Sequence, residues 1–72
     1  MIKVISKTFD INPDEVQFDM TPLDVDAWDS LGQLLLINNV EESFNVILEL
    51  EEIFRIMKLG DILEILEEKG KI

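Results

Sequence analysis

Apolar residues recur at helical spacing along most of the chain. Ile2, Ile5 and Phe9 stand three and four residues apart, which predicts a short amphipathic first helix. A second and longer helix should open at Asp29-Ser30 and end near Asn45, because its apolar positions repeat with the same period. Its inward face should carry Leu36, Ile37, Val40 and Phe44, and two further leucines should lie on the opposite side, Leu31 and Leu35.

The C-terminal part carries two shorter predicted helices. The stretch 46–50 is apolar and β-branched, but a lone strand has no partner here, so we expect an extended connector with alternate residues inward. A short third helix should follow over 51–57, with its apolar side formed by Ile53, Phe54 and Met57. The last helix should cover about 59–69 and stop at Gly70. Its predicted inward face consists of Leu59, Ile62, Leu63 and Leu66.

The stretch 10–29 shows no sustained helical period. It contains the turn signals Asn12-Pro13-Asp14 and Thr21-Pro22, so we interpret it as a long ordered loop over the core, with one helical turn near 14–16. Loops of this length in compact domains are often functional. The sequence therefore predicts one domain, 1–72, with an all-α fold: a small four-helix bundle with a short third helix and a long first loop.

Several function classes are excluded by residues that the chain lacks. The 72 residues include no cysteine and no histidine. The chain itself can supply neither a disulfide, a thiolate zinc site nor a thiol nucleophile, and a Ser-His-Asp device cannot be built. We therefore expect no catalytic residue and no enzyme. No apolar tract has transmembrane length, and the N-terminus does not resemble a signal peptide, so we expect a cytoplasmic protein without membrane insertion.

Charge is distributed unevenly along the chain. Sixteen acids face six bases, and the stretch 8–54 contains twelve acids and no Lys or Arg. Direct binding of nucleic acid needs cations against phosphate and is not expected. We expect a monomer that meets basic patches on other proteins. Asp24 and Asp26 resemble the first ligands of a calcium loop, but Trp28 and Leu35 stand at later ligand positions, so no metal site is predicted.

The most informative segment is Trp28-Asp29-Ser30-Leu31-Gly32. One interpretation is an ordinary helix N-cap, since either Asp29 or Ser30 can accept a first-turn N–H. The other is a hydroxyl at an exposed helix start, where backbone N–H groups favour an anion such as a phosphate ester. Gly32 would then keep the first turn open to an approaching protein. Trp28 either seals the loop onto the core or acts as a lid beside the serine.

Four landmarks give the chain a resemblance to a known family. They are Asp29-Ser30-Leu31 after a Trp and before a Gly, the turn at 12–16, the acidic Glu41-Glu42-Ser43-Phe44 and the helix start at 59–62. Over 4–69 the sequence resembles acyl carrier proteins, within the wider family of acyl and peptidyl carriers. The resemblance implies an acyl-carrier-like bundle in which a phosphopantetheinyl transferase, with Mg²⁺, attaches 4′-phosphopantetheine covalently to Ser30.

The resemblance also implies partners. The thiol of the arm would carry acyl or aminoacyl groups as thioesters. Asp29, Leu31, Glu41 and Glu42 would dock basic surfaces of acyl-transferring or acyl-modifying enzymes. Fatty-acid, lipopolysaccharide, polyketide and aminoacyl routes all stay open.

Other interpretations of these residues remain. Leu31 could instead be a partly buried core residue, and the two glutamates a solvated helix face. Lys58 departs from the family, which has Thr or Ser at that capping position, so the last helix is expected to fray at its start. The whole chain could also be an unmodified, carrier-like acidic adaptor that acts only through protein–protein interaction.

Overall fold

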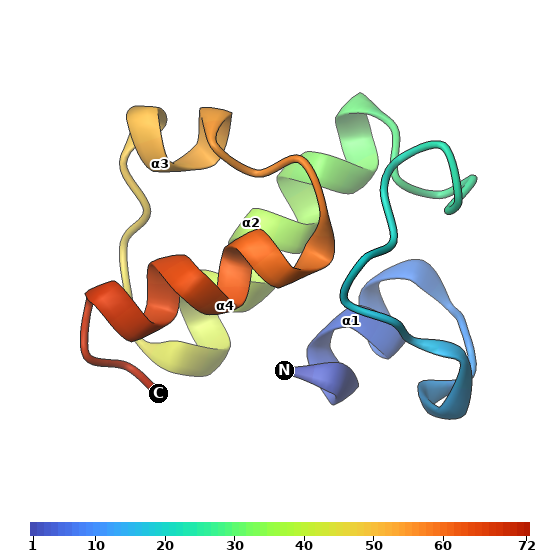
Figure 1. Ribbon diagram of the computed structural model, residues 1–72, viewed down its shortest axis with the longest axis horizontal. Coiled ribbons are helices and arrows are strands. Elements are labelled where there is room, and N and C mark those ends of the chain that lie inside the picture. The colour runs from blue at the N-terminus through green and yellow to red at the C-terminus, as the bar shows by residue number, and fades with distance from the viewer.

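The computed structural model describes all residues, 1–72, and contains helices and no strand (Figure 1). The elements in chain order are α1 (Ile2–Phe9), the single-turn 3-10 helix η1 (Pro13–Glu15), α2 (Ser30–Phe44), α3 (Leu50–Phe54) and α4 (Leu59–Glu68). The prediction of a small all-α helical bundle is confirmed, as are the short third helix and the long first loop.

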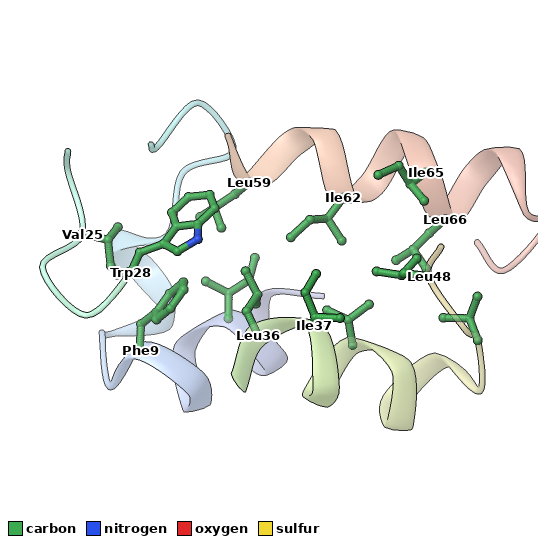
Figure 2. Close-up of a cluster of buried hydrophobic side chains, with 13 residues drawn as sticks. Phe9, Val25, Trp28, Leu36, Ile37, Leu48, Leu59, Ile62, Ile65 and Leu66 are labelled. Atoms are coloured by element: carbon green, nitrogen blue, oxygen red, sulfur yellow. The ribbon is translucent and has the colours of Figure 1, made fainter. Parts of the chain in front are cut away.

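The core lies between α1, α2 and α4, and α2 and α4 run in the same direction on either side of it (Figures 1 and 2). No charged or polar side chain is buried in it. Of the residues predicted to face inward on α1, Ile5 and Phe9 are buried, whereas Ile2 is 39% exposed. The fully buried large side chains are Ile5, Leu36, Val40, Leu59, Ile62, Ile65 and Leu66.

The long first loop is ordered because it is bonded at both ends and in the middle. The predicted helical turn is η1, where the Asn12 side chain accepts the N–H of Asp14 at 2.9 Å. Further along, the carbonyl oxygens of Phe18 and Met20 accept the first two N–H groups of α4, at 2.8 and 3.0 Å. These bonds satisfy helix-start donors that would otherwise lack a partner. The loop therefore covers the core, as expected.

The connector after α2 is extended, and its side chains alternate as predicted. Val46 and Leu48 are buried, whereas Ile47 is 80% exposed. The third helix, however, is shorter than the predicted stretch 51–57. Phe54 and Met57 are each 72% exposed, so their assignment to its inward side was wrong.

Partly buried Ile53, which packs against the core, and two ion pairs join α3 and the residue after it to the rest of the molecule. None of its residues is fully buried. Lys69 lies 2.9 Å from a carboxylate oxygen of Glu52, and Arg55 donates two hydrogen bonds to Glu68, at 2.8 and 3.0 Å. The backbone N–H of Glu49 and the ammonium group of Lys69 lower the pKa of Glu52. Charged side chains at the end of α4 therefore lie directly beside the short helix.

The start of α4 does not fray, which corrects the expectation drawn from Lys58. Asp61 in the first turn accepts the backbone N–H groups of Met57 and Lys58, at 2.8 and 3.0 Å. The Met57 N–H is the largest cause that lowers the pKa of this carboxyl. Asp61 thus satisfies the N–H groups just before the helix, and the carbonyl oxygens of Phe18 and Met20 accept first-turn N–H groups of the kind that a Thr or Ser cap would bond.

The inward face of α4 is also shifted slightly from the predicted one. Ile65 is fully buried and Leu63 is only half-buried, because the helix presents its 62/65/66 edge to α2 and the connector. Gly70 has the left-handed φ of 72° that the predicted stop requires.

Candidate functional site

Asp29 caps the longest helix. Its side-chain oxygen accepts the N–H of Gly32 at 2.8 Å, and its carbonyl oxygen accepts the N–H of Gln33 at 2.8 Å. An acidic cap also suits the positive end of the helix dipole. The N-cap interpretation is therefore confirmed for Asp29, and Ser30 is left without a capping role.

Ser30 is the first residue of α2 and is exposed to solvent. Its hydroxyl takes part in no hydrogen bond within the chain, because Asp29 supplies the cap oxygen. The backbone N–H groups of Ser30 and Leu31 also have no acceptor in the chain. A nucleophilic hydroxyl and two free N–H donors therefore share one exposed helix end, an arrangement that suits a covalently attached anion.

Trp28 seals the loop onto the core, and the alternative of a lid beside the serine is wrong. The indole is only 4% exposed and packs against Phe9, with ring centroids 5.7 Å apart (Figure 2). Its N–H donates to the side-chain oxygen of Gln33 at 2.6 Å. The bond fastens the loop to α2 three residues after Ser30. The sequence analysis did not single out Gln33. A polar side chain in the first turns of the helix, five residues after Trp28, was the only signal for this bond.

Gly32 is required by the loop rather than by an approaching protein. The residue is buried, and a β-carbon on it would lie on the carbonyl oxygen of Ala27. The expectation that it opens the first turn to a partner was therefore wrong. The close approach instead fixes the direction in which the chain enters α2, and with it the position of Ser30.

Exposed leucines follow Ser30 along the outer side of α2. Leu31 is 65% exposed, Leu34 67% and Leu35 47%, so the alternative that Leu31 belongs to the core is wrong. Leu34 stands three residues after Leu31, a spacing that could have predicted its position on the same side. These three residues, which we call the leucine stripe, give the serine end of the helix an apolar surface.

The two glutamates near the end of α2 differ in their surroundings. Glu41 is half-buried, and its carboxylate accepts the N–H of Leu48 at 2.9 Å. It therefore holds the connector after α2, a role that local spacing did not predict. Glu42 is exposed and pairs with no cation. Glu42 is the freer of the two for contact with another protein.

No protein-family model matches the chain, and no curated protein matches it in sequence. No helix has both the length and the apolar character needed to cross a membrane. Groups of three or more acidic side chains close enough to hold a metal ion are also absent. The feature of the molecule that bears on function is the geometry around Ser30.

Proposed function

We propose that the chain is an acyl carrier protein that holds acyl or related thioester intermediates on 4′-phosphopantetheine attached to Ser30. The observation that carries the proposal is that two neighbouring residues, Asp29 and Ser30, have separate roles. Asp29 caps α2, and the Ser30 hydroxyl is thereby left exposed and without a hydrogen bond. A modifying enzyme can therefore reach the hydroxyl without breaking a bond of the fold.

The residues around Ser30 fit the phosphate of such an arm. The free N–H groups of Ser30 and Leu31 lie at the positive end of the helix dipole, where a phosphodiester is favoured. When bound, the arm supplies the thiol that carries the acyl group, which the chain lacks because it has no cysteine. The chain itself contributes the attachment point, a rigid helix start and the surface that partners read.

Partner recognition would combine charge and apolar contact. Asp29, the cap of α2, and Glu42, within α2, are exposed acidic residues, and Glu41 adds a half-buried carboxylate. They would steer basic surfaces of the transferase and of acyl-transferring enzymes, whereas Leu31 would enter an apolar notch. We place the carrier in fatty-acid, lipid or secondary-metabolite biosynthesis in the cytoplasm, as a monomer.

Intact-mass spectrometry tests the attachment. The chain is incubated with coenzyme A, Mg²⁺ and a broad-specificity phosphopantetheinyl transferase that modifies a known carrier in a parallel sample. The wild type should gain one phosphopantetheine, Ser30→Ala should gain none, and Ser43→Ala, an exposed serine on the same helix, should behave as the wild type.

The same assay separates the carrier from its competitor. A folded wild type that stays unmodified would overturn the proposal and favour an acidic adaptor. A Ser30→Ala variant that is still modified would place the arm on another residue and would also overturn it.

A further inference from the structure

A groove opens beneath the long first loop, on the side where α1 ends. It encloses about 330 Å³, at the lower end of the range for ligand sites, and five of its eight lining residues are apolar. Phe9 and Val25 line it from the core, and the half-buried Met20 lines it from the loop. Figure 2 shows Phe9 and Val25 together at this end of the core, beside Trp28.

Carboxylates make up the rest of the lining. Glu15, Asp24 and Asp26 are exposed at the groove, and none of them pairs with a cation of the chain. No Lys or Arg occurs anywhere from 8 to 54, so the acidic charge is not neutralised locally. Their spacing does not form a metal site. Leu23, in the same loop, is 96% exposed and extends the apolar character beyond the groove.

We propose that this groove binds a short basic segment of a partner protein, which inserts one large apolar side chain between flanking Lys or Arg residues. An apolar floor with an acidic rim complements that pattern in both shape and charge. The small volume admits a side chain rather than a helix face. The site is built by loop 10–29 and does not include Ser30, so it is independent of the proposed attachment of an arm.

The test titrates the unmodified chain with a capped pentapeptide of sequence Lys-Arg-Phe-Arg-Lys. Binding is followed through the amide chemical shifts of the chain in two-dimensional NMR. Shifts should concentrate at residues 9–27. A peptide with Ser in place of Phe should bind at least about tenfold more weakly, the factor expected when one buried aromatic side chain is removed. A peptide that keeps Phe but replaces the four cations by Gln and Ser should bind about tenfold more weakly as well.

A matched pair of variants locates the charge effect. Glu15→Gln with Asp26→Asn removes two rim charges, and we expect about fivefold weaker binding. Asp24 is left in place because its carboxylate accepts the N–H of Thr21 at 2.9 Å. Glu64→Gln with Glu67→Gln removes the same charge from the exposed side of α4 and should change affinity by less than about twofold.

Three results would overturn the proposal: equal binding of the Ser peptide, equal weakening by both variant pairs, or shifts centred outside the groove. Ser30→Ala should bind the peptide like the wild type. A failure here is therefore distinguishable from a failure of the phosphopantetheine assay, which depends on Ser30 alone.

Discussion

Gly32 packs so tightly against Ala27 that a β-carbon at position 32 would lie 1.9 Å from the Ala27 carbonyl oxygen. In an ordinary helix interior, replacing Gly by Ala stabilises by about 1 kcal/mol. Here the obstacle is backbone, which cannot rotate away, so we expect Gly32→Ala to lower the free energy of unfolding by about 1–3 kcal/mol. Urea unfolding followed by circular dichroism measures the change.

Asn38→Ala is the matched control for Gly32→Ala. Asn38 is exposed on the same helix and makes no side-chain hydrogen bond, so Ala should raise stability by roughly 0.5 kcal/mol. If Gly32→Ala stabilised the chain as Asn38→Ala does, the close approach to Ala27 would be refuted.

Asp29→Ala and Ser30→Ala should differ in stability although the two residues are neighbours. Removing the cap oxygen of Asp29 should cost about 1 kcal/mol, the usual cost of losing an N-cap side chain. Ser30→Ala should stay within about 0.5 kcal/mol of the wild type, because its hydroxyl bonds to nothing in the chain. The same urea titration compares them, and a larger loss for Ser30→Ala would contradict the assignment of the cap.

Asp61 gives the molecule a pH-dependent contribution at the start of α4. Its pKa is lowered from the usual 3.8, chiefly by the Met57 N–H. The ionised carboxylate therefore stabilises the fold above pH 3.8, and this contribution disappears as the pH falls through the lower native pKa. The melting temperature of Asp61→Asn should lie below that of the wild type near neutrality, and the gap should close in strong acid.

Glu67→Gln is the control for the pH experiment. It removes the same charge from an exposed residue whose side chain accepts no hydrogen bond within the chain, and its melting temperature should show no such gap. A wild-type advantage over Asp61→Asn that is constant with pH would show that the charge of Asp61 has no part in the cap.

Salt should stabilise the chain, because its net charge is −10 and only three ion pairs oppose the repulsion. From about 20 mM to about 0.5 M NaCl the screening length falls from about 20 Å to about 4 Å. We expect the melting temperature to rise by roughly 5 °C. The double variant Asp19→Asn with Asp26→Asn should have a higher melting temperature than the wild type at low salt, and added salt should raise that temperature by less. An equal rise in both proteins would count against self-repulsion.

Local pattern was sufficient for much of the fold. The period of the apolar residues predicted α2 and α4, the Asn12-Pro13 pair predicted η1, and Gly70 predicted the stop of the last helix. The same pattern failed where contacts come from distant parts of the chain. The bonds from Phe18 and Met20 to α4 are not visible in spacing, so the sequence predicted a frayed start.

The candidate site was predictable in its residue types but not in their division of roles. The sequence placed Asp29 and Ser30 at a helix start and could not decide which one caps it. The sequence also predicted that Gly32 leaves room for a partner. The close contact with the Ala27 carbonyl depends on the path of the loop, which spacing along the chain does not show. Phe54 was predicted on the apolar side of the third helix together with Ile53, whereas only Ile53 packs against the core and Phe54 is exposed.

The separation of capping from the free hydroxyl has a practical consequence for protein engineering. A position that contributes nothing to the integrity of the scaffold can receive a fluorophore, a crosslinker or a synthetic substrate analogue, and the tertiary structure does not have to adjust. In this chain the Ser30 hydroxyl is such a position, because it is exposed and forms no hydrogen bond within the fold.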